Sequence, residues 1–264
     1  MAAISFSKKK GFICDMDGVI YHGNQILPGV AEFIDWLHRE NKEYLFLTNN
    51  SGYTPRELHQ KLSRMGLNVP EERFYTSALA TAAFLKNQAP GCSVYAIGEA
   101  GLLNALYDAG ITMNDVNPDY VVIGEGKAYS LDTLTRATNL VMQGAKLIGA
   151  NTDVSGPIEN GISPACGALV APIELATGKK AYFCGKPNPL MMRTGLRLLG
   201  CHSEEAVIVG DRMDTDVIAG LESGADTVLV LSGVSDRATI QTYAYQPTMI
   251  LDGVGDIARL AAGE

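Results

Sequence analysis

The chain has 264 residues, of which 47% are apolar and 19% are charged, a composition that excludes a disordered chain and is typical of a globular protein with a buried core. Twenty-one Lys and Arg stand against 29 Asp and Glu, so the formal net charge is −8. This acidic balance excludes general binding to a nucleic-acid polymer, but not a small phosphorylated ligand, because a few local cations and a metal ion can outweigh the net charge.

Short β-rich runs alternate with helical patterns along the chain, which predicts an α/β fold in which crossover helices join parallel strands. Strands are predicted, in chain order, at 12–15, 43–48, 93–98, 119–124, 146–150, 181–185, 206–211 and 226–231. Helices are predicted at 29–40, from a capping box of Thr54 and Glu57 onward, and near 77–87, 100–109, 130–143, 166–177, 188–199 and 214–223. The segments 235–246 and 247–264 are expected to complete the core.

Neither a secretory signal nor a membrane helix is recognisable. The basic residues 8–10 precede only three apolar residues, whereas a signal needs roughly 7–15, and no stretch reaches the ~18 apolar residues of a membrane span. The cysteines are odd in number and form no CxxC pair; they are Cys14, Cys92, Cys166, Cys184 and Cys201. We therefore expect free thiols, a cytoplasmic location and no membrane partner.

Asp15, Asp17 and Gly18 directly follow the apolar part of the first predicted strand. Residues two apart in an extended chain point to the same side, so the two carboxylates are expected to converge, and Gly18 allows a sharp turn after them. Two carboxylates in one small space repel each other, and a divalent cation relieves that repulsion. A solvated Asp-Gly turn is the alternative that this segment alone leaves open.

A second acidic turn, 210–216, ends the predicted strand 206–211. Parallel strands end at one edge of their sheet, so Asp211 is expected on the same edge as the first acidic pair. Oxygen ligands that leave several positions to water suit Mg²⁺. The alternative is a helix start, with Asp214 as its cap and Asp216 in its first turn; capping and metal binding can hold together.

Thr48 begins a run of small polar residues, 48–51, whose hydroxyl, amide and N–H groups can hold phosphate oxygens. Lys186 stands between the strand 181–185 and a proline that precedes a helix capped by Asn188, and its charge can offset that of a phosphate. Taken singly, a polar turn and a surface lysine are the alternatives. Two acidic strand ends, a hydroxyl strand end and a lysine strand end on one edge together predict phosphoryl transfer through a carboxylate nucleophile.

In this order the residues resemble the four motifs of haloacid dehalogenase (HAD) superfamily phosphatases. The motifs are Asp15-x-Asp17-Gly18, Thr48, Lys186 and Gly210-Asp211-x-x-x-Thr215-Asp216. Nearly the whole chain is similar to subclass IIA and to its NagD-type ribonucleotide monophosphatases, most clearly at 14–19, 75–78, 115–119, 164–169 and 231–235. The resemblance implies a HAD-like core with a Rossmann-like, doubly wound parallel sheet (1–78 and 181–264). It also implies an inserted α/β cap domain (79–180) that closes over the site and reads the leaving group.

The resemblance also implies the chemical roles of the motif residues. Asp15 is expected to attack phosphorus and form an aspartyl-phosphate. Asp17 is expected to protonate the leaving alcohol and then to deprotonate the water that releases phosphate. Thr48 and Lys186, with Asn49 nearby, are expected to bind the transferring phosphoryl group.

Mg²⁺ is the cofactor that the resemblance implies. Its expected ligands are the Asp15 carboxylate, the Asp17 backbone carbonyl and Asp211, with Asp216 close behind as a further metal-site residue. Mg²⁺ and Lys186 would offset the repulsion between an anionic nucleophile and an anionic phosphate.

Two polar regions of the inserted segment have different expectations. Residues 151–153 and 155–163 are predicted to form a polar loop that faces the substrate, with a plain surface loop as the alternative. The Gly-rich fragments 98–101 and 124–126 do not complete a dinucleotide-binding motif, and we expect them to be turns of the cap.

The function predicted from the sequence is a Mg²⁺-dependent phosphomonoesterase for nucleoside 5′-monophosphates such as UMP. Phosphoglycolate, pyridoxal phosphate and sugar phosphates are alternative substrates within the same class. A phospho-acceptor switch is an alternative from another class, disfavoured because a switch needs neither the second acid of Asp15-x-Asp17 nor a long insert. A non-catalytic phosphate-binding module is disfavoured because no motif residue is missing. The expected partner is a small phosphorylated metabolite; a homo-oligomer through the cap is left open by the resemblance.

Overall fold

The computed structural model describes residues 4–127, 129–158 and 161–263. The chain forms two compact units, each built from separate pieces of the sequence. The first comprises Met1–Thr48, His59–Tyr75 and Lys186–Glu264. The second comprises Asn49–Leu58 and Thr76–Gly185. Each unit is described by itself below.

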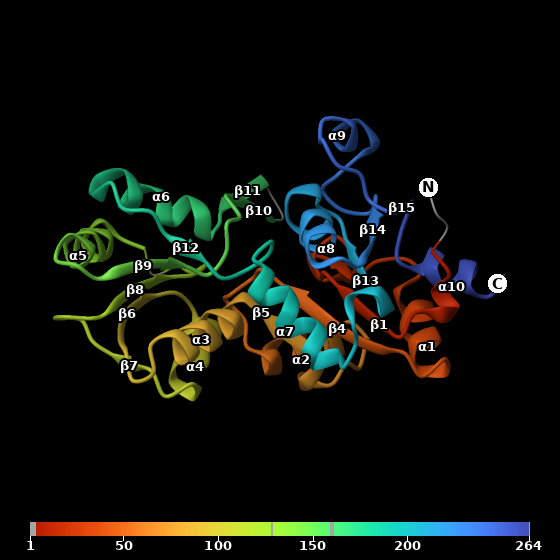
Figure 1. Cartoon of the computed structure of the whole chain (residues 1–264), viewed down its shortest axis with the longest axis horizontal. Coiled ribbons are helices and arrows are strands. Elements are labelled where there is room, and N and C mark those ends of the chain that lie inside the picture. Colours follow the sequence, from red (N-terminus) through yellow and green to blue (C-terminus); the bar gives the residue numbers. More distant parts are fainter. Residues whose placement is uncertain (1–3, 128, 159–160, 264) are drawn as a thin grey trace. The chain divides into compact units, whose positions relative to one another are not determined.

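Figure 1 labels most of the elements of both units. The strands are β1 (Gly11–Cys14), β2 (Tyr21–His22), β3 (Gln25–Ile26), β4 (Glu43–Thr48), β5 (Phe74–Thr76), β6 (Ser93–Ile97), β7 (Thr112–Met113), β8 (Tyr120–Ile123), β9 (Lys146–Gly149), β10 (Ser155–Ile158), β11 (Gly161–Pro164), β12 (Tyr182–Phe183), β13 (Ala206–Gly210), β14 (Asp226–Val230) and β15 (Met249–Leu251). The α-helices are α1 (Val30–Arg39), α2 (Pro55–Arg64), α3 (Ser77–Gln88), α4 (Ala100–Asp108), α5 (Leu131–Met142), α6 (Cys166–Thr177), α7 (Pro189–Leu199), α8 (Ile218–Ser223), α9 (Arg237–Gln241) and α10 (Gly255–Ala261).

The first unit is built on a six-stranded sheet in the order β15-β14-β13-β1-β4-β5. The strands from β15 to β4 run parallel. Alternation along β1 supplies both faces of this sheet: the Phe12 ring meets Phe33 and Trp36 of α1 edge-on, at 6.0 and 5.3 Å between centroids. Ile13 points to α7 on the other face, where a Cβ on Gly195 would lie 3.2 Å from the Ile13 side chain. Helices therefore cover both faces, which confirms the predicted doubly wound core.

The second unit has its own five-stranded parallel sheet in the order β12-β9-β8-β6-β7. Val121 and Ile123 of β8 pack with Leu140 of α5 and Val170 and Ile173 of α6 in one buried cluster. Figure 1 shows α5 and α6 on one side of this sheet and α3 and α4 on the other. The prediction of a second α/β sheet is thus confirmed.

The strongly patterned elements occur where the sequence predicts them. All eight predicted strands are present, and Thr54 and Glu57 form the predicted capping box: Glu57 N donates to Thr54 Oγ1 at 3.2 Å, and Thr54 N donates to Glu57 Oε2 at 2.8 Å. Asn188 caps α7 by accepting a hydrogen bond from Leu190 N at 2.8 Å. All five cysteines are free thiols, as expected. No helix of the described residues combines the length and apolarity that crossing a bilayer requires.

One prediction of local structure is wrong, and one predicted helix differs in its helical type. The segment 155–163 was expected to be a loop, but Ser155–Ile158 and Gly161–Pro164 pair as an antiparallel hairpin; positions 159 and 160 lie outside the described residues. Its side chains of described burial are exposed or only partly buried, with Ile162 at 75%, so no apolar alternation marks it in the sequence. The helix expected at 214–223 is present; it begins with a π-helical turn, Met213–Val217, and continues as the short α8.

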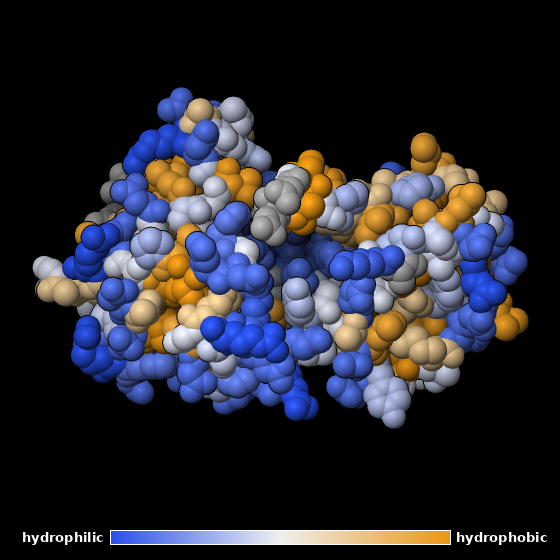
Figure 2. Space-filling view, turned by 180° about the vertical axis from the view of Figure 1, so that it is seen from behind, coloured by the Kyte–Doolittle hydropathy of each residue, from blue (hydrophilic) through white to orange (hydrophobic). Residues whose placement is uncertain are grey.

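Among the described residues, fewer large apolar side chains are exposed in the first unit than in the second. Figure 2 shows apolar side chains interspersed with hydrophilic ones on the face turned away from the view of Figure 1. The most exposed are Leu175, Leu131 and Tyr107, at 89%, 80% and 79%. Single exposed apolar residues of this kind are common on soluble domains and identify no interface by themselves.

Candidate active site

The predicted acidic residues meet at the carboxyl ends of two neighbouring strands of the first unit. Asp15 follows β1, and its N–H donates to Val209 O at 2.8 Å, which extends the pairing of β1 with β13 by one residue. Asp211 follows β13 directly. Because these two strands are parallel neighbours, their carboxyl ends bring Asp15 and Asp211 together.

Lys186 links two of the carboxylates. Its Nζ lies 2.7 Å from Asp15 Oδ1 and 2.7 Å from Asp216 Oδ1, and the residue is 3% exposed. Burial by itself lowers the pKa of a lysine, but the charges and hydrogen bonds of Asp15 and Asp216 outweigh burial and raise the pKa of Lys186 above its ordinary value. Lys186 is therefore a fixed, buried cation at the strand ends.

Asp15, Asp211 and Asp216 form a compact acidic group. One oxygen of each lies within 4.8 Å of the others. Burial, and then the charges of Asp15 and Asp216, raise the pKa of Asp211 to about 8. Burial also raises the pKa of Asp216 to about 6, although Lys186 opposes that rise. So much negative charge in a buried space is unfavourable without a further cation.

The residues fit a divalent metal ion. Asp211 Oδ2 accepts a hydrogen bond from Val234 N at 2.7 Å. Asp211 Oδ1 is fully buried and has no hydrogen-bond partner within the described residues. A buried oxygen without a donor is rare in native proteins, and here it belongs to an all-oxygen group of the kind that Mg²⁺ prefers.

Asp17 has a different environment from this acidic group. Its Oδ2 accepts a hydrogen bond from the Tyr21 hydroxyl at 3.1 Å. Burial raises the pKa of Asp17, and the charge of Lys61 and the Tyr21 hydrogen bond oppose the rise. Its carboxylate does not belong to the acidic group found among the described residues. A raised pKa favours the protonated form of this carboxyl, which is the form that a general acid needs.

Gly18 lets the chain turn back after Asp17. Its φ of +78° is strained for any residue with a side chain. A Cβ at this position would also lie 2.5 Å from Asp211 Oδ2. The turn therefore requires glycine for its conformation and for the close approach of the Asp211 carboxylate.

Thr48 and Asn49 stand at the end of β4, where the chain passes from the first unit to the second. Thr48 is 4% exposed, in the first unit. Asn49 belongs to the second unit, and its Nδ2 donates to Asp153 Oδ1 at 3.2 Å. The carbonyl of Asn49 accepts hydrogen bonds from Ser77 and Asn151. Both residues of the predicted phosphate-binding run are thus buried, and Asn49 is held by hydrogen bonds.

Sequence reasoning missed a polar network in the second unit. Glu125, in a fragment predicted to be only a turn, accepts hydrogen bonds from Ser51 and Asn151 through its two carboxylate oxygens. Asn151, predicted to lie in a substrate-facing loop, is fully buried. No motif marks these residues; the one available signal is that Ser51, Glu125 and Asn151 are polar and lie two or three residues after a strand.

The residues Tyr21 and Lys61, beside Asp17, were also missed. The Lys61 Nζ lies 3.8 Å from the centroid of the Tyr21 ring. Lys61 lies in α2, after the predicted helix start, and the sequence does not distinguish it from a lysine exposed to solvent. The Tyr21 position was equally unmarked, since it follows the acidic pair in an apolar run.

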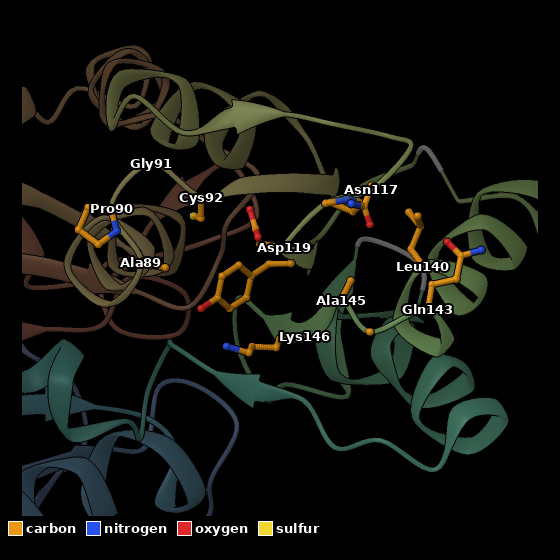
Figure 3. Close-up of a pocket in the computed structure, with 13 residues that line it drawn as sticks. Ala89, Pro90, Gly91, Cys92, Asn117, Asp119, Leu140, Gln143, Ala145 and Lys146 are labelled. Carbon is orange, nitrogen blue, oxygen red and sulfur yellow. The ribbon is translucent and has the colours of Figure 1, made fainter.

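The second unit contains a cleft of about 510 Å³ at the amino-terminal ends of its strands β6, β8 and β9. Figure 3 shows its lining, which comes from the segments that enter β6, β8 and β9, with Asp119 and Lys146 among the polar residues. None of the predicted site residues lines this cleft. The cleft therefore contributes none of the residues that the sequence predicts to carry the chemistry.

A doubly wound core with acidic, lysine and hydroxyl strand ends defines a phosphoryl-transfer enzyme, and comparisons with known proteins agree with that class. Residues 12–112 match the family model described as haloacid dehalogenase-like hydrolase, and residues 183–257 match a HAD-hydrolase-like model. The chain belongs to the haloacid dehalogenase-like hydrolases, in the subclass IIA group of NagD-type and p-nitrophenyl phosphatases. It is a phosphatase of small phosphate monoesters.

Three known proteins illustrate the similarity. The chain is 48% identical to dihydroxyacetone phosphatase of Corynebacterium glutamicum, over 94% of this chain and 90% of that protein. It is 43% identical to ribonucleotide monophosphatase NagD of Escherichia coli, over 94% and 98%. The crystal structure of a 4-nitrophenylphosphatase from Thermotoga maritima matches with a TM-score of 0.94 at 32% identity, over 98% of this chain and all of that one.

Proposed function

We propose that this chain is a Mg²⁺-dependent phosphomonoesterase that works through an aspartyl-phosphate on Asp15 and hydrolyses nucleoside 5′-monophosphates. The observation that carries the proposal is the acidic group of Asp15, Asp211 and Asp216, in which the Lys186 ammonium pairs with Asp15 and Asp216. It joins a carboxylate nucleophile, a fixed cation and free metal-binding oxygen in one place.

In the proposed reaction an Asp15 oxygen bonds to phosphorus as the bond between phosphorus and the leaving oxygen breaks. Asp17 gives its proton to that leaving oxygen and becomes a carboxylate. A water molecule then attacks phosphorus, Asp17 takes its proton, and the bond between Asp15 and phosphorus breaks. Both carboxyl groups return to their starting states, as a turnover cycle requires.

In this proposal the remaining motif residues bind the phosphoryl group and offset its negative charge. Lys186, 2.7 Å from Asp15 Oδ1, offsets the negative charge of the incoming phosphoryl group. Thr48 binds a phosphoryl oxygen through its hydroxyl, with Asn49 beside it. Mg²⁺ would be held by Asp15, the Asp17 carbonyl and Asp211, with Asp216 beside them, and when bound it reduces the repulsion between nucleophile and phosphate.

The second part of the proposal concerns the inserted domain. We assign the catalytic core to 1–78 and 181–264 and the reading of the leaving group to the cap, 79–180. This division is supported by the compact unit that contains Thr76–Gly185 and by the polar residues that follow β8 and β9 in it. A cytoplasmic location and a homo-oligomer through the cap remain predictions of the same resemblance.

Dihydroxyacetone phosphate is a second candidate substrate. The identity to the dihydroxyacetone phosphatase is higher than the identity to the ribonucleotide monophosphatase, over similar shares of the chain. The two substrates share a phosphate on a primary alcohol and differ in the size of the alcohol. A preference between them therefore measures what the cap reads and leaves the chemistry of the core unchanged.

The test is phosphate release from UMP, GMP, dihydroxyacetone phosphate, phosphoglycolate, pyridoxal phosphate, a hexose phosphate and 4-nitrophenyl phosphate, with Mg²⁺ and with EDTA. We expect Mg²⁺-dependent turnover with the highest kcat/KM on nucleotides. A highest kcat/KM on dihydroxyacetone phosphate would replace the proposed substrate by the second candidate. Asp15→Asn should abolish turnover, and Asp214→Asn, an exposed acid paired with Arg212, is the matched control. Full activity in EDTA or in Asp15→Asn would contradict the mechanism.

A further inference from the structure

The backbone of Tyr21 is bound to the residues on either side of Asp17. Tyr21 N donates to Met16 O at 3.3 Å, and Gly18 N donates to Tyr21 O at 2.9 Å. Asp17 and Tyr21 also form an isolated β-bridge. This closed turn fixes the start of the Tyr21 side chain relative to Asp17, so the hydroxyl reaches Asp17 Oδ2 at 3.1 Å from a rigid base.

The ring of Tyr21 is held from a second direction. Tyr21 is 2% exposed, and the Lys61 Nζ lies 3.8 Å from its ring centroid. A cation over the face of an aromatic ring is attracted by the ring electrons, more strongly when partly removed from water. Lys61 is half-buried, and its charge also acts on Asp17. Neither Tyr21 nor Lys61 belongs to the four motifs of the family.

We propose that Tyr21 and Lys61 are positioning residues for the acid–base group: the Tyr21 hydroxyl, held by Lys61, fixes the Asp17 carboxyl so that Oδ1 carries the proton to the leaving oxygen. The inference rests on the proposed role of Asp17. A hydroxyl that donates to Oδ2 makes Oδ2 the acceptor oxygen of the protonated carboxyl and leaves the proton on Oδ1. That proton passes to the leaving oxygen as its bond to phosphorus breaks and the bond from Asp15 to phosphorus forms.

A positioning role for proton donation has a specific kinetic consequence. An alkoxide leaves slowly without a proton, whereas a nitrophenolate leaves readily without one. Since kcat/KM reports the steps up to phosphoryl transfer, loss of correct proton placement should lower kcat/KM for an alkyl phosphate and change it little for 4-nitrophenyl phosphate. A general loss of structure would lower both.

The experiment compares kcat/KM for UMP or dihydroxyacetone phosphate with kcat/KM for 4-nitrophenyl phosphate in Tyr21→Phe, which removes the hydroxyl and keeps the ring. We expect a loss of about tenfold on the alkyl ester and less than about twofold on the nitrophenyl ester. Lys61→Met should give a smaller loss of the same kind, and Lys61→Arg should restore the rate because a guanidinium also stacks on an aromatic face. The double variant Tyr21→Phe with Lys61→Met should be no slower than Tyr21→Phe, because Lys61 acts through that hydroxyl.

Two matched controls separate position from packing. Tyr44→Phe removes another buried hydroxyl of the first unit, which lies 3.3 Å from His38 Nε2, and Lys42→Met removes another ammonium near an aromatic ring, 6.0 Å from the Trp36 centroid. Both should keep the wild-type ratio between the two esters. Equal losses on both esters in Tyr21→Phe and in Lys61→Met, or no loss in either, would overturn the inference.

Asp17→Asn distinguishes this inference from the proposed function. If Asp17→Asn slows the alkyl ester by roughly 10²-fold or more while Tyr21→Phe behaves as wild type, the acid stands and the positioning inference fails. If Asp17→Asn leaves the alkyl ester unaffected, the proposed role of Asp17 fails, and the inference fails with it.

Discussion

Replacement of Lys186 by Met removes an ammonium that pairs with two carboxylates, the partly buried Asp15 and the buried Asp216. The Met side chain keeps most of the apolar length of Lys, so the change is mainly electrostatic. In the folded protein Nζ lies 2.7 Å from both Asp15 Oδ1 and Asp216 Oδ1, and the lysine is 3% exposed. Lys186→Met therefore leaves Asp15 and Asp216 without their ammonium partner, next to a third acid, Asp211.

The expected loss of stability follows from burial. Removing one partner of a buried ion pair costs about 3–5 kcal/mol, because the other charge stays buried without compensation. Two carboxylates lose their partner here, but burial already raises the pKa of Asp216 to about 6, and without Lys186 that pKa rises further. The folded variant therefore takes up a proton as pH falls, and the deficit should be largest near pH 8 and smaller near pH 5.

The assay is denaturant unfolding without metal, followed by the fluorescence of Trp36, the single tryptophan, which is 3% exposed in the core of the first unit. We expect Lys186→Met to lower the free energy of unfolding at pH 8 by about 3–5 kcal/mol. Lys10→Met, which breaks the exposed pair with Glu205 in the same unit, is the control and should change it far less.

A second variant tests whether the uncompensated charge of Asp216 causes the loss of stability. Adding Asp216→Asn to Lys186→Met removes one uncompensated acid, so the double variant should recover a substantial part of the lost stability at pH 8. Three results would contradict a buried-charge effect of Lys186. They are a Lys186→Met variant no less stable than Lys10→Met, a loss in free energy of unfolding that is the same at pH 5 and pH 8, and a larger loss when Asp216→Asn is added.

The acidic group and its turn give two further predictions. Burial raises the pKa of Asp211 to about 8 and that of Asp216 to about 6, so between about pH 4 and pH 8 the folded state holds protons that the unfolded state has lost, and the free energy of unfolding falls as pH rises. Mg²⁺ should consequently raise the melting temperature at pH 8, by the equivalent of about 2.7 kcal/mol at a hundredfold excess over its Kd, and much less at pH 5; calorimetry that finds the larger effect at pH 5 would contradict the metal assignment. Gly18→Ala should weaken Mg²⁺ binding, measured by calorimetric titration, and should lower the free energy of unfolding by more than Gly23→Ala does. Gly23 is the control because it shares the positive φ but has open space where a Cβ would lie. Equal effects of the two substitutions would show that the contact with Asp211 is unimportant.

The core of the fold could be predicted because its signals are local and strong. Glu43–Thr48 is an apolar run that ends in a polar turn, and Ala206–Gly210 repeats the pattern. Parallel strands end on one edge, so the approach of Asp15 and Asp211 followed from the strand assignments alone. The motif spacing then restricted the chemistry to phosphoryl transfer.

Other features lie outside what such patterns report. In the hairpin of β10 and β11, the side chains of described burial are exposed or only partly buried, so these strands carry no periodic apolar signal. The contact of Lys61 with Tyr21 joins two elements far apart in the sequence, and the burial of Asn151 depends on partners in two other segments. Long-range polar contacts leave no trace in one sequence, because any exposed position would permit the same residue types.

The interleaving of the two units bears on the order in which the chain folds. In the first unit's sheet, Gly11 of β1 pairs with Ala206 of β13, so the centre of that sheet closes only after the whole second unit has been synthesised. The second sheet draws all its strands from one continuous stretch, Ser93–Phe183. During translation the second sheet can form while the edge of β1 that pairs with β13 is still unpaired. An unpaired parallel strand edge as apolar as Phe12–Cys14 is prone to aggregation, and a pause in synthesis before residue 206 would prolong that exposure.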